Sequence, residues 1–244
     1  MSLPTFYIPP AGITGDTAVL SGDELRHARV TLRLGSGDRV RVVDGEGRSW
    51  DACIQTMEKG KSSLTLSRKE MEVVPDFHLT VAMGIVQGER FDWAIQKGTE
   101  LGVTAFVPLV TERTEFRTGG YWKRLDRLQR VIVSACKQCG RARFPDLSEP
   151  VPLRDLDTSR YDLSVVFWEE HADGALKNAV KAVDPPGSCL MVVGPVGGLT
   201  REEVEFLRGK GCIVAGLGSR ILRTETAVTA GASLLQFLWG DMGN

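Results

Sequence analysis

The sequence contains few of the residues on which metal and acid–base chemistry usually depend. Histidine occurs only three times in 244 residues, at His27, His78 and His171. Cysteine occurs five times, an odd number, at scattered positions. Cys136 and Cys139 form one CxxC pair, but no second pair supplies the remaining ligands of a zinc site. We therefore expect reduced and mostly buried thiols, no metal ion and no histidine-based catalysis.

Long hydrophobic runs are also absent. No apolar segment approaches the roughly 20 residues that cross a bilayer. The amino terminus lacks the charged-then-apolar pattern of a signal peptide, so we expect a cytoplasmic protein. The composition that remains is ordinary for a globular protein, with 42% hydrophobic and 25% charged residues and a formal net charge of −1. This length and composition predict a soluble enzyme of two domains.

The amino-terminal part predicts a small β-rich domain. Residues 39–43 and 63–67 alternate apolar and polar side chains, and residues 44–47 have the composition of a turn. Pro75-Asp76 marks the expected linker. We therefore assign residues 1–73 to the first domain and residues 74–244 to the second.

One short helix is expected inside the first domain. Ser21 and Glu24 have the Ser-x-x-Glu spacing of a capping box, in which each side chain bonds the other residue's backbone N–H. The helix would carry Arg26 and Arg29.

The second domain predicts strands alternating with helices, which is typical of a parallel sheet in an α/β fold. Ligands of such sheets bind beyond the carboxyl ends of the strands. The expected elements are, in order, strand 78–86, helix 91–101, strand 105–110, helix 122–138, strand 163–168, helix 172–183, strand 189–193, a helix capped by Thr200 and Glu203, strand 212–217 and a helix from Thr224.

Two glycine-bearing loops, Gly194–Gly198 and Leu217–Thr226, each follow an expected strand and precede a helix. Glycine lets backbone approach a small molecule closely, because it has no Cβ and reaches positive φ at little cost. The first loop is not a P-loop, because no Gly-Lys-Ser/Thr follows it. The second loop is not a dinucleotide-binding loop, because Ile221 occupies the position of the last glycine in that motif. We expect both loops to line one ligand pocket. The alternative is a pair of tight connections without a ligand.

Positive charge is concentrated between residues 113 and 143. This segment contains nine basic residues and only two acidic ones, Glu115 and Asp126. Such an excess of positive charge suits contacts with nucleic-acid phosphates. A solvated helix face is the alternative. The basic residues are Arg113, Arg117, Lys123, Arg124, Arg127, Arg130, Lys137, Arg141 and Arg143.

The last expected helix has a face of small residues, Ala227, Ala230, Gly231 and Ala232, beside large apolar ones. Such a face suits either close packing in a dimer or an ordinary core helix.

The carboxy-terminal pattern as a whole resembles the SPOUT superfamily of knotted methyltransferases, and most closely its RsmE-type family, which methylates N3 of a uridine in 16S ribosomal RNA. The resemblance covers nearly the whole chain. Its further motifs are His27, Leu32-Arg33, Gly37-Asp38, Asp44-Gly45-Glu46-Gly47, Gly88-Glu89-Arg90, Gln96 to Val103, Pro108 and Lys137 to Arg141. The family usually carries an acidic residue where this chain has Val196, so the role of that carboxylate is not carried over.

The resemblance implies a PUA-like barrel that binds RNA, followed by a SPOUT domain with a trefoil knot, in an obligate homodimer. Chain physics alone would predict an unknotted sheet. The resemblance also implies that S-adenosylmethionine (SAM) binds at the two loops. The expected cofactor-binding residues are Gly194, Pro195, Gly197, Gly198, Leu217, Gly218, Ile221 and Leu222.

Methylating a uracil N3 needs a positioned methyl donor and removal of the N3 proton. Arg223 is the expected stabiliser of the charge that then spreads onto the uracil oxygens, because a guanidinium is always charged. Glu225 is the candidate proton acceptor, although an ion pair with Arg223 or a role at the helix dipole would also explain it. Lys97 and Glu100 are expected to form a local pair. The expected RNA-binding residues are Arg26, Arg29, Arg113, Arg127, Lys137, Gln138 and Arg141.

Two other functions are compatible with the sequence. One is a different SPOUT enzyme that acts on transfer RNA or on a ribose hydroxyl. The other is a ribosome-assembly factor that binds RNA and has lost methyl transfer, an alternative that Val196 keeps open.

Overall fold

The computed structural model describes residues 3–114, 122–170, 176, 180 and 184–243, with the backbone alone for residues 122–124. Its contacts divide the chain into two compact units. The first comprises Met1–Val74 together with Val133–Phe144, and the second comprises Pro75–Ile132 and Pro145–Asn244. The long helix α3 (Trp122–Cys139) therefore begins in the second unit and ends in the first. The predicted boundary between residues 73 and 74 would place this whole helix in the second domain.

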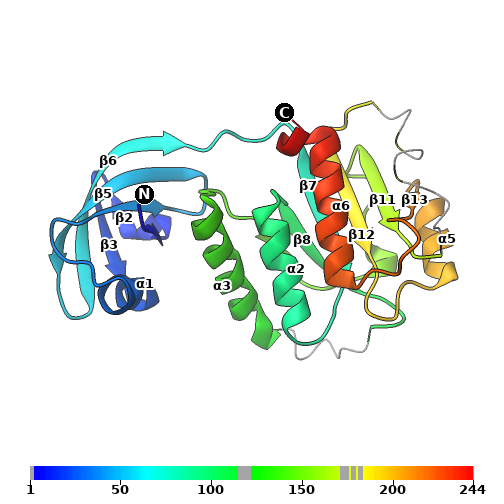
Figure 1. Ribbon diagram of the computed structural model, residues 1–244, viewed down its shortest axis with the longest axis horizontal. Coiled ribbons are helices and arrows are strands. Elements are labelled where there is room, and N and C mark those ends of the chain that lie inside the picture. Colours follow the sequence, from blue (N-terminus) through cyan, green and yellow to red (C-terminus); the bar gives the residue numbers. More distant parts are fainter. Residues whose placement is uncertain (1–2, 115–121, 171–175, 177–179, 181–183, 244) are drawn as a thin grey trace. The chain divides into compact units, whose positions relative to one another are not determined.

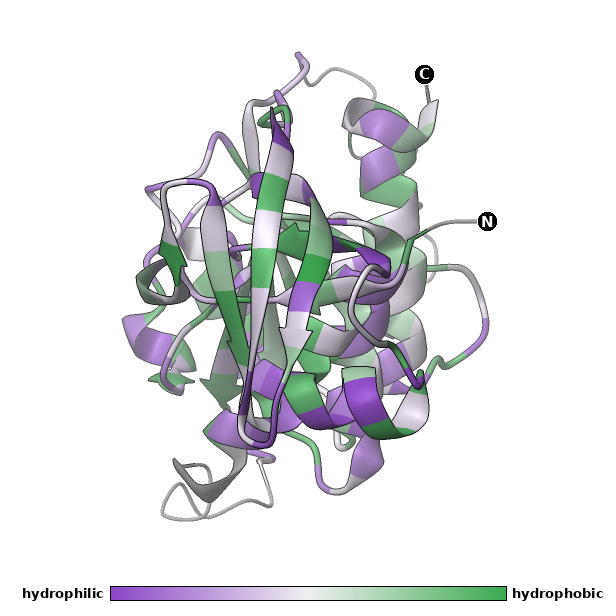
Figure 2. Ribbon diagram, turned by 90° about the vertical axis from the view of Figure 1, so that its left-hand side faces the viewer, coloured by the Kyte–Doolittle hydropathy of each residue, from purple (hydrophilic) through white to green (hydrophobic). Residues whose placement is uncertain are grey.

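The first unit is built on a six-stranded sheet with the order β1-β4-β5-β6-β3-β2. β1 pairs with β4 in parallel, and the other neighbouring strands pair antiparallel. Alternate side chains of β3 are buried. Figure 2 shows hydrophilic and hydrophobic residues interspersed along the strands. The strands are β1 (Thr5–Tyr7), β2 (Ile13–Thr14), β3 (Thr17–Ser21), β4 (Arg39–Val43), β5 (Arg48–Met57) and β6 (Lys61–Met71).

The turn between β4 and β5 is held by the buried carboxylate of Asp44. Its Oδ1 accepts hydrogen bonds from the backbone N–H of Glu46, at 2.8 Å, and of Arg48, at 3.0 Å. An aspartate that bonds the backbone just ahead of it is a common way to reverse a chain. The turn predicted at residues 44–47 is therefore confirmed.

The short helix of the first unit lacks the capping box that Ser21 and Glu24 predict. α1 (Gly22–Arg26) does begin after Ser21, and it continues into a π-helical turn, η2 (His27–Thr31), but the Ser21 side chain makes no capping bond. The Glu24 carboxylate instead accepts from Lys137 Nζ at 2.6 Å and from the backbone N–H of Tyr7 at 3.3 Å. The capping-box prediction is wrong because Glu24 pairs with Lys137, which is distant in sequence.

The second unit contains a sheet in which every pairing is parallel, with the order β10-β8-β7-β12-β11-β13 and β9 beside β8. This confirms the predicted α/β class. β11 is buried along its whole length, as expected for a strand covered on both faces. The strands are β7 (His78–Gly84), β8 (Ala105–Val110), β9 (Asp146–Leu147), β10 (Val151–Pro152), β11 (Leu163–Phe167), β12 (Ser188–Val193) and β13 (Ile213–Ala215).

Among the described residues, three more helices accompany this sheet. Helices α2 (Glu89–Glu100) and α6 (Thr224–Trp239) lie side by side, and α6 packs on β7 and β12 (Figure 1). α5 (Arg201–Gly209) has the capping box predicted for Thr200 and Glu203. The described part of the chain also contains the short 3-10 turns η4 (Leu153–Asp155) and η5 (Asp241–Gly243) in this unit and η1 (Pro10–Gly12) in the first. The helix predicted at 172–183 lies outside the described residues, apart from the buried Leu176 and Val180.

The small residues of α6 face the interior of their own unit. A Cβ on Gly231 would come within 2.5 Å of Phe167 Cε2 and 2.7 Å of Met191 Sδ, and Ala232 is fully buried. Ala227, Gly231 and Ala232 therefore belong to the core of this unit, which favours the core-helix alternative for this face, and Ala230 is half-buried. The exposed apolar side chains of α6 are instead Leu234, Phe237 and Leu238.

The five cysteines are free, and Cys136, Cys189 and Cys212 are buried. In the part of the chain that the structure describes, no group of His, Cys, Asp and Glu side chains is arranged to hold a metal ion. None of the described helices combines the length and the apolar character that a membrane crossing needs.

Candidate functional site

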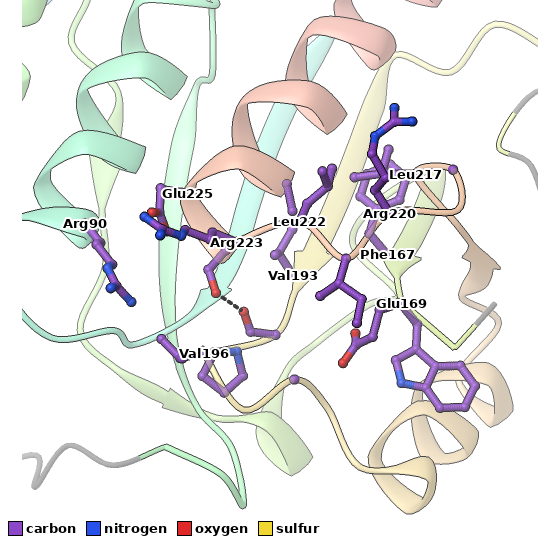
Figure 3. A pocket seen from close by; sticks show the side chains of 18 residues that line it. Arg90, Phe167, Glu169, Val193, Val196, Leu217, Arg220, Leu222, Arg223 and Glu225 are labelled. Atoms are coloured by element: carbon purple, nitrogen blue, oxygen red, sulfur yellow. Dashed lines mark hydrogen bonds between the residues drawn. The ribbon is translucent and has the colours of Figure 1, made fainter. Parts of the chain in front are cut away.

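A pocket in the second unit opens at the carboxyl ends of β11, β12 and β13 (Figure 3). This is the edge of a parallel sheet where ligands usually bind. Both glycine-bearing loops line the pocket, as their positions after the strands predict. Its lining residues are Arg90, Phe167, Trp168, Glu169, Val193, Gly194, Pro195, Val196, Gly198, Leu217, Gly218, Arg220, Ile221, Leu222, Arg223, Thr224, Glu225 and Ala227.

The first loop is a tight turn that only glycine can form at two positions. The N–H of Gly198 donates to the carbonyl O of Pro195 at 2.9 Å, with Gly198 at φ +71°. A Cβ on Gly198 would overlap the Glu169 carboxylate, and one on Gly194 would come within 2.9 Å of the backbone N of Leu199. Close backbone contacts and positive φ both exclude larger residues.

The second loop runs from β13 to α6 and includes Gly218 at φ +94°. A hydrogen bond joins it to the first loop: Thr224 Oγ1 donates to the carbonyl O of Gly194 at 3.1 Å, the dashed line in Figure 3. Both groups are buried. The two loops therefore form one backbone cradle.

Charged side chains enter the pocket from several elements. Figure 3 draws Arg90, Arg223 and Glu225 on one side of the pocket and Glu169 on the other. Two buried polar atoms of the lining, Glu225 Oε2 and Trp168 Nε1, have no hydrogen-bond partner among the described residues. A buried polar atom without a partner is costly unless a ligand or water satisfies it. The pocket therefore offers both acceptor and donor capacity to a bound molecule.

The structure brings most of the expected cofactor and catalytic residues together in this pocket. Gly197 is the exception, because it is exposed and does not line the pocket. Its carbonyl O accepts a hydrogen bond from Arg113 Nη1 at 2.7 Å. No ion pair joins Arg223 to Glu225 among the residues described. The residues that line the pocket as expected are Gly194, Pro195, Gly198, Leu217, Gly218, Ile221, Leu222, Arg223 and Glu225.

Other lining residues were not singled out from the sequence. Glu169 and Trp168 directly follow the strand Leu163–Phe167, so their position at a strand's carboxyl end was the available signal. That signal was insufficient, because the sequence does not show that β11 and β12 are adjacent in the sheet. Arg90, in the first turn of α2, belongs to the Gly88-Glu89-Arg90 motif of the resemblance, but it was not assigned to the site because it is far from both loops in sequence.

The expected RNA-binding residues fall into two groups. Arg113, Arg127 and Lys137 have intramolecular partners: Gly197 O, the Asp92 carboxylate and the Glu24 carboxylate, respectively. Lys137 also lies 5.7 Å from the centre of the Phe6 ring. Arg26, Arg29 and Gln138 are exposed, and Arg141 is half-buried. The role of all seven in RNA binding stays a prediction, and the side chains of Arg117, Lys123 and Arg124 lie outside the described residues.

The expected pair of Lys97 and Glu100 is confirmed, since Lys97 Nζ lies 2.9 Å from both carboxylate oxygens of Glu100. It does not line the pocket. The pair therefore belongs to the support of α2.

Comparison with known proteins agrees with this arrangement. Residues 74–236 match the family described as an RNA methyltransferase domain, and residues 20–67 match the RNA methyltransferase PUA domain. The chain belongs to this family of RNA methyltransferases. The predicted resemblance to the RNA methyltransferases is therefore confirmed.

Among curated proteins, the chain is similar to the ribosomal RNA small subunit methyltransferase E of Bacillus subtilis. The two are 30% identical over 234 residues, which cover 91% of this chain and 90% of that protein. The enzyme of the same name from Aquifex aeolicus is 28% identical over 228 residues, covering 91% and 94%.

Two solved structures have the same fold. A methyltransferase of Legionella pneumophila, in complex with SAM, gives a TM-score of 0.90 at 28% identity and covers 99% of this chain and 100% of its own. The ribosomal RNA small subunit methyltransferase E of Neisseria gonorrhoeae, also bound to SAM, gives 0.85 at 30% identity, with coverage of 97% and 98%.

Proposed function

We propose that this protein uses SAM to methylate N3 of a uridine in 16S ribosomal RNA. The observation that carries the proposal is the cradle of two glycine-bearing loops, joined by Thr224 and Gly194, at the ligand-binding edge of a parallel sheet. The proposal is supported by SAM in two solved structures of the same fold and by relatives named for small-subunit ribosomal RNA. For such a substrate we propose a cytoplasmic protein.

The residues present fit a nucleoside cofactor with a charged methionine part. Gly218 has open space where a Cβ would stand, which allows close approach of a flat ring or a ribose, while Gly194 and Gly198 keep the first loop tight. Arg90 and Arg220 offer guanidinium groups for a carboxylate, and Glu169 offers an acceptor for hydroxyl or amino groups. When bound there, SAM supplies the electrophilic methyl group.

The chain's contribution to the reaction is mainly placement. Holding two reactants in attack geometry lowers the barrier by several kcal/mol, on the order of 7 to 11 in favourable models. Because N3 is engaged in a Watson–Crick pair, the target uridine must be unpaired or flipped out of its stack. The unpartnered Glu225 Oε2 accepts the N3 proton, and Arg223 stabilises the negative charge on the uracil oxygens.

The domain and knot assignments are part of the proposal. The division of contacts between Val74 and Pro75 and the two matched families support domains of residues 1–73 and 74–244, although Val133–Phe144 packs with the first unit. The trefoil knot is proposed for the carboxy-terminal part from the family resemblance. An experimental chain trace from β11 to α6 tests it.

We also propose a homodimer through the exposed face of α6. Leu234, Phe237 and Leu238 lie at helical spacing and are 43%, 62% and 42% exposed, and Met242 follows them at 50%. Sedimentation analysis tests the proposal: the wild-type protein should be a dimer, and Phe237→Glu should give a monomer. A monomeric wild type would contradict it.

Nucleoside mass spectrometry of 16S RNA tests the activity. RNA from cells that lack the protein should have lost one 3-methyluridine, and purified protein with SAM should restore it. A methyl group on a ribose hydroxyl or on transfer RNA would indicate a different SPOUT enzyme. Binding of RNA without binding of SAM would favour the assembly factor, the alternative that the exposed Val196 in the first loop favours.

A further inference from the structure

The loop that follows β8 contacts the first glycine loop although 84 positions separate the bonded residues. Arg113 Nη1 donates to the carbonyl O of Gly197 at 2.7 Å. The Arg113 stem lies against the same glycine, because a Cβ on Gly197 would stand 3.2 Å from Arg113 Cβ and 3.4 Å from Cδ. The contact thus combines a charge-assisted hydrogen bond with close packing.

The backbone that carries Arg113 is itself held in place. Thr114 Oγ1 accepts from the backbone N–H of Thr111 at 2.9 Å, and the two threonine hydroxyl groups lie 3.0 Å apart. The N–H of Glu112 donates to Glu203 Oε1 at 2.8 Å. The backbone at Arg113 is therefore fixed independently of its side chain, so the hydrogen bond ties Gly197 O to an anchored turn.

Glu203 connects the same turn to the helix that follows the first loop. Its Oε2 accepts from the N–H of Thr200 at 3.0 Å, while its own N–H donates to Thr200 Oγ1 at 3.2 Å. One carboxylate thereby bonds the start of α5 with one oxygen and the turn after β8 with the other. The turn after β8 is thus bonded to Gly197 through Arg113 and to Thr200 through Glu203.

The first loop is therefore held at two carbonyl groups. Thr224 bonds Gly194 O beside the pocket, and Arg113 bonds Gly197 O at the exposed outer end of the loop. Between them lie Pro195 and Val196, which line the pocket. A shift of the Gly197 carbonyl therefore displaces the adjoining backbone of Val196 and Pro195, which lines the pocket.

From this geometry we infer that Arg113 is a positioning residue for the cofactor. It holds the outer end of the first glycine loop in the conformation that binds SAM. This inference rests on the proposed function, and it gives Arg113 a role that the net positive charge of its segment does not predict. Arg113 acts through Gly197 and does not itself line the pocket.

Calorimetry with SAM, in the absence of RNA, tests the inference. Arg113→Met keeps an unbranched apolar stem but removes the hydrogen bond, and it should weaken SAM binding about five- to tenfold, the effect of losing one charge-assisted bond at an exposed site. Arg113→Lys retains a donor and should recover part of the affinity. Arg208→Met is the matched control, because Arg208 is an exposed arginine that pairs with Glu205 on α5 and does not line the pocket.

A second variant approaches the same contact from the loop. Gly197 has no positive φ, so Gly197→Ala introduces little backbone strain but presses on Arg113 Cβ. It should weaken SAM binding by a similar factor. The two substitutions together should weaken it no more than either alone, because both remove one shared contact.

Steady-state kinetics provides a readout that a purely structural defect would not give. The Met variant should raise the KM for SAM and leave kcat at saturating SAM and the affinity for RNA unchanged. Unchanged SAM affinity in Arg113→Met, or additive effects of the two substitutions, would overturn the inference, and a loss confined to RNA affinity would make Arg113 an RNA ligand. If the wild-type protein failed to bind SAM, the proposed function and this inference would fall together.

Discussion

Thr224 and Gly194 join the two loops of the pocket by one buried hydrogen bond of 3.1 Å. Thr224 is the first residue of α6, and Gly194 directly follows β12. The bond therefore attaches the start of the last long helix to the carboxyl end of a central strand. No other side-chain bond links the two loops among the residues that the structure describes.

Thr224→Val should lower both stability and cofactor affinity. The substitution leaves the buried carbonyl of Gly194 without its side-chain donor, which costs about 1–3 kcal/mol. Urea unfolding and SAM calorimetry measure the two effects. Thr229→Val is the control, because Thr229 Oγ1 makes a local helical bond of 2.9 Å to Glu225 O and does not line the pocket. Equal behaviour of the two variants would contradict the prediction.

Gly198→Ala should unfold more easily and lose SAM binding. Alanine at φ +71° costs about 1–2 kcal/mol, and its Cβ would also displace the Glu169 carboxylate. Gly209→Ala is the matched control, since Gly209 lies in α5 without positive φ and with open space around it. That change should be neutral or stabilising by about 0.5–1 kcal/mol. Thermal unfolding with and without SAM separates the two outcomes.

Glu225→Gln should slow methyl transfer without weakening SAM binding. An amide cannot take the N3 proton, and loss of a general base lowers the rate by about 10²- to 10⁴-fold. Single-turnover measurements at saturating SAM and RNA report the rate. Glu205→Gln on the exposed face of α5 should behave as the wild type. A Glu225 variant with an unchanged rate would exclude this residue as the proton acceptor.

Lys137→Met should destabilise the first unit. The side chains of Lys137 and Glu24 are only 17% and 22% exposed, and the substitution leaves the Glu24 carboxylate, among the described residues, with the Tyr7 N–H as its one remaining hydrogen-bond donor. The cost should be about 1–3 kcal/mol, between that of exposed and fully buried ion pairs. Urea unfolding measures it, with the exposed Arg26→Met as control. A loss of RNA affinity at unchanged stability would support the sequence-based role of Lys137 instead.

Three thiols should be unreactive in the native protein. Burial raises the pKa of Cys136 and Cys189 to about 12 and that of Cys212 to about 11. A thiol with a raised native pKa stabilises the fold fully below its ordinary value near 9, and this contribution is lost as the pH rises toward the native value. At pH 8 a thiol reagent should modify the exposed Cys139 quickly and these three only as the protein unfolds. Their rapid modification would contradict the described packing.

Two similar sequence patterns show how far local reasoning reaches. Thr200 and Glu203 form the predicted capping box, whereas Ser21 and Glu24 do not. The spacing is the same, but at Glu24 the carboxylate is bonded to Lys137, 113 positions away. Strand and helix ranges follow from local patterns and were predicted well. Partners distant in sequence decide the exceptions.

The same distinction applies to the pocket. The two glycine-bearing loops were recognisable because glycine composition and flanking strands are local features. Glu169 was not recognisable, since its placement depends on the order of strands in the sheet. Arg90 belongs to a motif of the family resemblance, but its place in the pocket depends on how α2 packs in the folded unit. The small residues of α6 were ambiguous for a related reason: their packing on Phe167 and Met191 requires the folded sheet.

The central pairing of the sheet bears on how the protein folds. β7 pairs with β12, so that Leu79 lies opposite Cys189, more than 100 residues later. Contacts of such high sequence separation form slowly, because a long stretch of chain must be ordered before they stabilise anything. During synthesis on the ribosome, the edge of β7 that pairs with β12 stays unpaired until β12 has been made. The pocket forms later still, because it also requires Thr224. We expect the ligand-binding edge to be the last part of this unit to mature, and chaperones to matter most during that interval.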